Sequence, residues 1–257
     1  MKITIRVALQ TATPPLKALT RDSNQAWIEA ERLLAHVLHR DRSWLIAHGN
    51  ERLSASASRS FARLMRRRLR HEPLAYLLGS QIFYGREFFV DRRVLIPRPE
   101  TEELVERARR IIESSPKPPI VWDVGTGSGA IAITIKKERP TIRVIASDVD
   151  AKALALAKKN ARRLKAKDIK FVQANLFDKK IERLIHSYIL HPTSYFLVLA
   201  NLPYLPLSDK RKLMPSVIKF EPSKTLFTKE NGLFLIHRLL QQLSNLSTRY
   251  EIRDTRF

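Results

Sequence analysis

Three of the seven glycines of this chain fall within five residues, in the segment Gly125-Thr126-Gly127-Ser128-Gly129. The segment follows the apolar run Ile120 to Val124 and precedes a helical pattern from Ala130 to Lys137, so it joins a strand to a helix. Glycines at such a junction permit a tight turn and let a ligand lie against the backbone near the N-terminus of the helix. The segment therefore predicts a cofactor site.

Asp148 lies nineteen residues after Gly129, at the end of the next apolar run. In nucleotide-binding folds a carboxylate at an offset of about 20 residues accepts hydrogen bonds from the ribose hydroxyls. The Gly-x-Gly-x-Gly spacing differs from the Gly-x-Gly-x-x-Gly that cradles a pyrophosphate, and no Gly-Lys-Ser/Thr follows it. These features favour S-adenosylmethionine over a dinucleotide or a nucleoside triphosphate.

The segment Asn201-Leu202-Pro203-Tyr204 directly follows another apolar run, and in an open α/β sheet it lies beside the glycine-rich turn. A planar amide or aromatic amine nitrogen is a poor nucleophile because its lone pair is delocalised. The Asn201 side-chain oxygen and the Leu202 carbonyl could accept its two N–H groups and direct the nitrogen at a methyl group. Pro203 would stiffen the turn, and Tyr204 would pack over the planar group. The segment predicts methyl transfer that depends mainly on orientation.

The elements that position these segments begin with a helical part. Apolar residues at helical spacing predict one helix over residues 24–48, capped by Asp22 or Ser23, and a second over residues 54–71. The second helix carries an arginine cluster that is either a solvated face or a phosphate-contacting surface. Aromatic and β-branched residues over 80–96 predict a hairpin, and a helix is expected at 100–114.

Beyond Pro119 short apolar runs alternate with helical patterns. Strands are predicted at 120–124, 143–146, 169–172 and 195–200, and helices at 130–137 and 151–164. This order predicts a doubly wound α/β domain whose parallel sheet is built of right-handed crossovers, a Rossmann-like fold.

Composition excludes several classes of protein. The chain has no cysteine, which excludes disulfides, thiolate metal sites and a cysteine nucleophile, and its seven scattered histidines show no metal-ligand spacing. No apolar run approaches the roughly 18 residues of a membrane-spanning helix. The first 21 residues hold four basic and no acidic residues but lack the features of a secretory signal, so we expect a cytoplasmic protein. The net charge of +22 suits an RNA or ribosomal neighbour, or it reflects compositional bias.

Further runs complete a specific pattern. They are Ala30 to Leu38, Pro73-Leu74-Ala75-Tyr76-Leu77-Leu78-Gly79, Phe83-Tyr84-Gly85, Leu95-Ile96-Pro97-Arg98-Pro99-Glu100-Thr101-Glu102, Glu221-Pro222 and Asn231-Gly232-Leu233. With the two segments above, they resemble the HemK-type peptide chain release factor glutamine methyltransferases over most of the chain. The resemblance implies S-adenosylmethionine as cofactor and the glutamine of the Gly-Gly-Gln loop of a release factor as substrate.

The resemblance also implies an organisation and a set of site residues. It divides the chain into a helical substrate-recognition domain (1–78), a β connector (79–99) and a methyltransferase domain (100–257), and it places Glu100 and Thr101 near the methionine end of the cofactor. The expected cofactor-binding residues are Gly125, Thr126, Gly127, Ser128, Gly129, Asp148, Asn175, Leu176 and Asn201, and the expected catalytic residues are Asn201, Leu202, Pro203 and Tyr204.

Three departures from the family pattern matter. Leu202 replaces the first proline of Asn-Pro-Pro-Tyr, which should be tolerated because a backbone carbonyl plays the role there. Asn175 stands where the family has an acidic residue near the adenine, although an amide can still bond an adenine edge. Eleven residues follow Leu246, so Tyr250 to Ile252 could form part of a fifth strand, but we expect the closing hairpin to be truncated and a sheet edge to be uncovered.

Two other functions stay open from the sequence. An adenine amino group of a nucleic acid is also planar and conjugated, so the same segment could orient it for methylation, and the positive charge favours this alternative. The chain could also be an inactive, truncated relative that binds RNA or a ribosomal partner through its basic surface.

Overall fold

The computed structural model describes residues 3–189 and 195–249. Contacts between residues divide the chain into two units. We call residues 1–79 and 214–220 the helical unit, and residues 80–213 and 221–257 the α/β unit. Among the described helices, none is both long enough and apolar enough to cross a bilayer.

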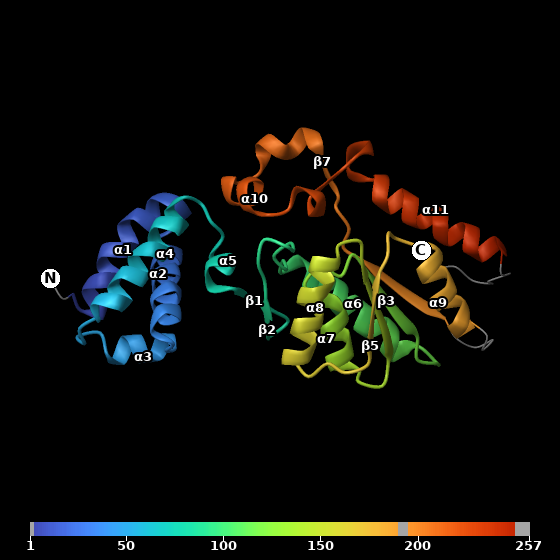
Figure 1. Cartoon of the computed structure of the whole chain (residues 1–257), viewed down its shortest axis with the longest axis horizontal. Coiled ribbons are helices and arrows are strands. Elements are labelled where there is room, and N and C mark those ends of the chain that lie inside the picture. The colour runs from blue at the N-terminus through green and yellow to red at the C-terminus, as the bar shows by residue number, and fades with distance from the viewer. Residues whose placement is uncertain (1–2, 190–194, 250–257) are drawn as a thin grey trace. The chain divides into compact units, whose positions relative to one another are not determined.

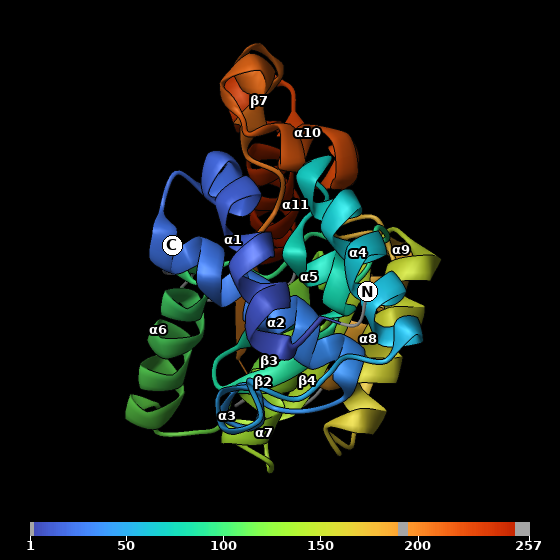
Figure 2. The same ribbon diagram turned by 90° about the vertical axis from the view of Figure 1, so that its left-hand side faces the viewer.

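The helical unit is built on three packed helices that Figure 1 shows side by side and that face the viewer in Figure 2. These are α1 (Ile5–Thr20), α2 (Ser23–Leu38) and α4 (Ala55–Leu69), and the short helices α3 (Arg42–Ala47), α5 (Leu74–Leu78) and α10 (Pro215–Phe220) complete the unit. Leu16, Leu33 and Leu34 are fully buried in its core. Leucine side chains on facing helices therefore hold this unit together.

Two features of this unit differ from the sequence prediction. The single helix predicted over 24–48 is wrong, because His39 adopts a left-handed conformation with φ +52° and Asp41 caps a new helix by accepting from the Trp44 N–H. Helix α1 was not predicted. It contains Pro14 and Pro15, which ordinarily disfavour a helix interior, yet its buried face contributes to the core.

The arginines of α4 fall into two groups. Arg68 forms an ion pair with Glu29 at 2.7 Å, and its side chain is only 12% exposed. Arg67 pairs with Glu72 at 2.8 Å, so its charge is also neutralised locally. Arg59, Arg63 and Arg66 are exposed, as is Arg70 directly after the helix. Part of the cluster therefore stabilises the unit instead of forming a solvated face.

The α/β unit begins with the predicted hairpin. Strands β1 (Ser80–Phe83) and β2 (Arg86–Phe89) pair antiparallel, and Tyr84 and Gly85 form the turn with φ of +49° and +68°. Helix α6 (Glu100–Ser114) follows with the bounds that the sequence predicted.

A parallel sheet forms the centre of this unit. Its described strands are β3 (Ile120–Val124), β4 (Arg143–Asp148), β5 (Ile169–Gln173) and β6 (Phe196–Ala200), in the order β5-β4-β3-β6. All three pairings are parallel. The helices are α7 (Ala130–Glu138), α8 (Ala151–Arg163), α9 (Lys179–Ile189) and α11 (Phe234–Arg249). The predicted doubly wound α/β fold is confirmed.

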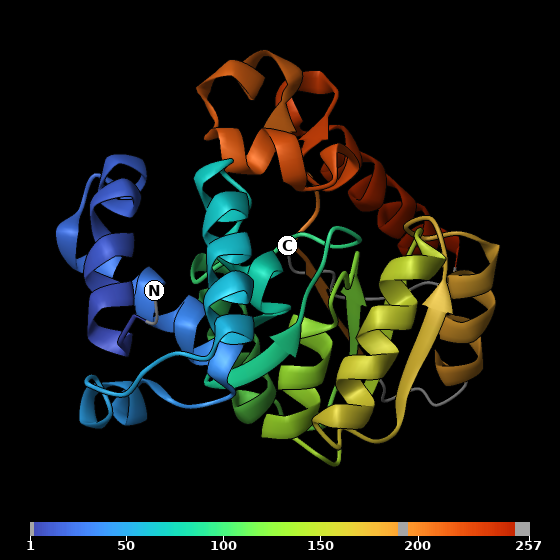
Figure 3. The same cartoon turned by 60° about the vertical axis from the view of Figure 1, so that its left-hand side comes forward.

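The alternation of strand residues explains the two layers of helices. Val121, Val144 and Leu199 point to a core shared with α6, α7 and α8. Trp122 and Ile145 point to the opposite face, against α9 and α11. Figure 3 shows β5 (yellow) between α8 (yellow-green) and α9 (gold). Successive residues of a strand face opposite sides, so both faces of the sheet are buried.

Irregular chain connects β6 to α11. It contains two short parallel strands, β7 (Leu205–Pro206) and β8 (Phe227–Thr228), and the 3₁₀ turns Leu207–Lys212, Ser223–Thr225 and Glu230–Gly232. Gly232 has φ +94°, and a Cβ there would collide with the Tyr204 carbonyl. The possible strand at Tyr250 to Ile252 lies outside the described residues.

Candidate functional site

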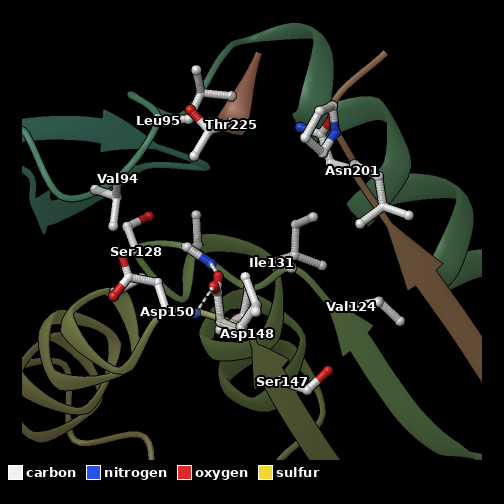
Figure 4. A pocket seen from close by; sticks show the side chains of 18 of the residues that line it. Val94, Leu95, Val124, Ser128, Ile131, Ser147, Asp148, Asp150, Asn201 and Thr225 are labelled. Atoms are coloured by element: carbon white, nitrogen blue, oxygen red, sulfur yellow. Dashed lines mark hydrogen bonds between the residues drawn. The ribbon is translucent and has the colours of Figure 1, made fainter. Parts of the chain in front are cut away.

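A cavity of about 200 Å³ lies at the carboxyl ends of the four parallel strands. Residues at or just beyond the end of each strand line it, as Figure 4 shows for Asp148, the last residue of β4, and Asn201, which follows β6. The cavity adjoins the boundary between β3 and β6, where the direction of strand succession reverses along the sheet. Open α/β sheets bind ligands at this position.

Most of the residues predicted for the site line this cavity. They are Gly125, Thr126, Gly127, Ser128, Asp148, Asn175, Leu176, Asn201, Leu202 and Pro203. Gly129 and Tyr204 do not belong to the lining, and the Tyr204 side chain is 59% exposed. Thr101 lines the cavity, whereas Glu100 is exposed at the start of α6.

The glycine-rich turn has the conformation that its residue types require. Gly125, Gly127 and Gly129 have φ of +72°, +55° and +83°. A Cβ on Gly129 would lie 2.7 Å from Ile133 Cδ1 and 3.2 Å from Ala157 Cβ. Gly129 therefore lets α7 and α8 approach each other, while Gly125 and Gly127 leave room at the wall of the cavity.

Asp148 is held in place by two backbone donors. Its Oδ2 accepts from the Gly127 N–H and its Oδ1 from the Asp150 N–H, each at 2.9 Å. Burial raises the pKa of Asp148, the two backbone hydrogen bonds oppose that shift, and the nearby Asp150 charge adds to it. Each carboxylate oxygen keeps a further acceptor position, so the group can also bind hydroxyls of a ligand.

Two buried residues that no sequence pattern indicated support the turn. Asp123 accepts from Thr126 Oγ1 at 2.6 Å and from the Ala132 N–H at 3.1 Å, and burial raises its pKa to about 7. Asn160 donates to the carbonyls of Ser128 and Phe89 and accepts from the Phe89 N–H. Hydrogen bonds therefore hold the turn to α7 through Asp123 and to β2 of the hairpin through Asn160.

The amide of Asn201 is also hydrogen-bonded. Its Nδ2 donates to Thr101 Oγ1 at 3.0 Å. Because Nδ2 is the donor side of the amide, this bond leaves the Oδ1 acceptor available. Leu202 follows with only 6% exposure, and the Cβ that Gly125 lacks would lie 3.2 Å from Leu202 Cδ2. The asparagine segment and the glycine-rich turn are therefore close neighbours.

The rim of the cavity comes from parts of the chain to which no chemical role was assigned. Arg98 pairs with Glu221 at 2.5 Å, and Glu221 Oε2 also accepts from the Ile96 N–H at 3.2 Å. Lys224 pairs with Asp150 at 2.5 Å. The remaining rim residues from these segments are Arg93, Val94, Leu95, Pro97 and Thr225. Only Leu95, Pro97, Arg98 and Glu221 fall within the runs Leu95 to Glu102 and Glu221-Pro222.

The chemistry of the lining suits an adenosine cofactor with an aliphatic arm. Asp148 provides acceptors for ribose hydroxyls, and Val124, Ile131 and Leu176 provide apolar surface for a base and a side chain. The described residues contain no group of three or more His, Asp or Glu side chains arranged to hold a metal ion.

Two protein families match this chain, one in each unit. Residues 8–79 match the family described as PrmC N-terminal domain, and residues 108–192 match the family described as Methyltransferase small domain. The first match falls in the helical unit and the second spans β3 to β5 of the sheet.

Comparison with individual proteins extends over both units. The chain is 39% identical to a release factor glutamine methyltransferase of Neisseria gonorrhoeae, over 83% of this chain and 74% of the relative. It is 35% identical to the enzyme of the same name from Bacillus cereus, over 93% and 81% of the two chains. The corresponding protein of Bordetella pertussis is 35% identical over 87% of this chain and 78% of its own.

Proposed function

This chain belongs to the release factor glutamine methyltransferase family, and we propose that it methylates the side-chain amide of the glutamine in the Gly-Gly-Gln motif of a peptide chain release factor. The methyl donor in this proposal is S-adenosylmethionine. Since such a substrate acts in translation, we place the reaction in the cytoplasm.

One observation carries the proposal: Asn201 and Leu202, which would orient the amide, and Asp148, which would bind the ribose, line the same cavity. Asn201 and Leu202 directly follow β6, and Asp148 is the last residue of β4. A methyl group and a planar nitrogen can therefore be brought together in one space. Holding two reactants in a productive geometry removes much of the entropic barrier to their reaction.

We assign cofactor binding to residues at the carboxyl ends of β3, β4 and β5. Asp148 would accept from the ribose hydroxyls, and Asn175 and Leu176 would contact the adenine. Gly125, Thr126, Gly127 and Ser128 would leave the backbone open to the ligand, and Gly129 would set the approach of α7. When bound, S-adenosylmethionine supplies an electrophilic methyl group.

We assign substrate binding to the residues after β6. Asn201 Oδ1 and the Leu202 carbonyl would accept the two N–H groups of the glutamine amide and direct its nitrogen lone pair into the cavity. Pro203 would keep this turn rigid. Tyr204 would cover the amide from the protein-substrate side, for which its exposed ring is available. A strong general base is not needed, because the amide proton becomes acidic only as the new bond forms.

The test uses radiolabelled S-adenosylmethionine with the purified protein. The substrates are a release factor, the same release factor with its Gly-Gly-Gln glutamine changed to alanine, and an RNA. We expect label on the intact release factor alone. Label on the RNA would support adenine methylation, and binding of cofactor without any transfer would support an inactive relative.

A matched pair of variants tests the assignment of Asn201. Removing one positioned hydrogen-bond partner at a reacting centre typically lowers kcat by about 10²–10³-fold. We expect Asn201→Ala to lose activity in this range. Asn245→Ala makes the same chemical change at an exposed position of α11 and should retain full activity. Equal activity of the two variants would contradict the assigned role.

A further inference from the structure

The hydrogen bond between Asn201 and Thr101 joins residues that are one hundred positions apart in the chain. Both side chains line the cavity, and the bond is partly buried. Asn201 lies at the end of β6, while Thr101 is the second residue of α6. The contact is therefore a tertiary feature of the cavity wall.

In the structure the nitrogen end of the Asn201 amide makes this bond. A carboxamide has an acceptor oxygen and a donor nitrogen of nearly the same shape, and only hydrogen bonding decides which end faces a given direction. With Nδ2 donating to Thr101, the oxygen is the end left for a ligand. An amide turned by 180° would present two N–H donors to the substrate amide instead, and these would repel its own N–H groups.

Contacts on both sides of Thr101 hold the start of α6 in place. Glu102, the next residue, accepts from the Tyr84 N–H at 2.8 Å, which ties the first turn of α6 to the hairpin. Arg98, just before the helix, pairs with the buried carboxylate of Glu221. Catalytic side chains need neighbours whose own positions are held in this way.

We propose that Thr101 is a positioning residue, which holds the Asn201 amide with its oxygen directed at the substrate amide nitrogen. The inference rests on the proposed function. It concerns an orientation of Asn201, and it is separate from any contact of Thr101 with the cofactor.

The first test replaces the Thr101 hydroxyl while keeping the shape of the side chain. Thr101→Val should lower kcat for release factor methylation by about 10-fold or more, because an Asn201 amide in the wrong orientation loses the hydrogen bond that it makes in the transition state. Thr101→Ser keeps the hydroxyl and should restore kcat to within about threefold of the parent. The dissociation constant for S-adenosylmethionine should stay within about twofold in both variants.

A matched control is available in the same unit. Thr134 is buried in α7, and its hydroxyl has no hydrogen-bond partner in the part of the chain that the structure describes. Thr134→Val should leave kcat and the melting temperature unchanged or raise the latter. If Thr101→Val lowers the melting temperature and cofactor affinity together with kcat, and Thr101→Ser fails to restore kcat, Thr101 is merely structural and the inference is wrong.

A second test uses the symmetry of a carboxylate. In Asn201→Asp both ends of the side chain are acceptors, so orientation no longer matters. Adding Thr101→Val to Asn201→Asp should therefore cause less than about a twofold further loss, against about 10-fold in the parent background. Equal losses in the two backgrounds would overturn the inference.

A third measurement does not depend on turnover. In protein labelled with ¹⁵N-asparagine, the side-chain NH₂ signal that Asn201→Ala removes belongs to Asn201. Its hydrogen exchange should be slow in the parent and in Thr101→Ser, and faster in Thr101→Val. Unchanged exchange in Thr101→Val would contradict the inference, whereas absence of label on the release factor with the parent protein would refute the proposed function instead.

Discussion

Replacing Gly129 by alanine tests how the site is built. Gly129 has φ +83°, which costs an L-residue about 1–2 kcal/mol. Its new Cβ would lie 2.7 Å from Ile133 Cδ1 and 3.4 Å from Ala157 Cα. Ile133 is fully buried, so it cannot swing into solvent, and overpacking of a core costs about 1–3 kcal/mol more. We therefore expect Gly129→Ala to lower the free energy of unfolding by about 2–5 kcal/mol.

Gly85 provides the control for the backbone contribution. It also has a positive φ, +68°, but a Cβ there would have no atom within 4 Å. Gly85→Ala should therefore lose only the backbone contribution of about 1–2 kcal/mol. Urea unfolding of both variants, followed by circular dichroism and by tryptophan fluorescence, measures the difference. Equal losses in the two variants would refute the claim that close packing of α7 and α8 requires glycine at position 129.

Two carboxylates give further predictions. Asp148→Asn should weaken S-adenosylmethionine binding by about 10-fold or more in calorimetry, because a neutral amide is a poorer acceptor for ribose hydroxyls. Its melting temperature should also fall, because the NH₂ end of the amide cannot accept the backbone N–H that one carboxylate oxygen binds in the parent. Because burial raises the Asp148 pKa, cofactor affinity of the parent should fall on acidification at a higher pH than an ordinary aspartate would give, and unchanged affinity down to pH 4 would contradict this role. For Asp123, with a pKa raised to about 7, the unfolded chain loses its proton at a lower pH than the folded chain, so the contribution to stability is complete below about pH 4 and is lost as pH rises through 7. Asp123→Asn should remove this decline from urea-unfolding curves measured between pH 4 and 8, and an equally steep decline in the variant would show that other groups cause it.

Local pattern was sufficient for much of the α/β unit. The hairpin, α6 and the four described parallel strands follow from short apolar runs, from helical spacing of apolar residues and from the turns that bound them, because these signals act within a few residues. The same holds for the meeting of Asp148 with the glycine-rich turn, since all parallel strands deliver their carboxyl ends to one edge of the sheet.

Local pattern failed where a nearby capping group or the core decided the outcome. The apolar spacing continues through His39, so it does not reveal that Asp41 starts a new helix there. Conversely, Pro14 and Pro15 weaken the helical signal of α1, while burial of Ile5, Leu9 and Leu16 stabilises that helix. A local cap decided the first outcome, and tertiary packing overrode local preference in the second.

By itself the sequence determined the type of fold, and it predicted the segments that line the cavity at one edge of the sheet, because each depends on residue types at short and regular spacing. Only the tertiary structure brought Thr101 to Asn201, Glu221 to Arg98, and Asn160 to the turn that ends at Gly129. These partners are separated by 32 to 123 residues, and hydrogen bonds over such separations leave no periodic trace in the chain. They form only after the helices and strands have packed, when a buried polar group must find a partner or lose the free energy of its hydration.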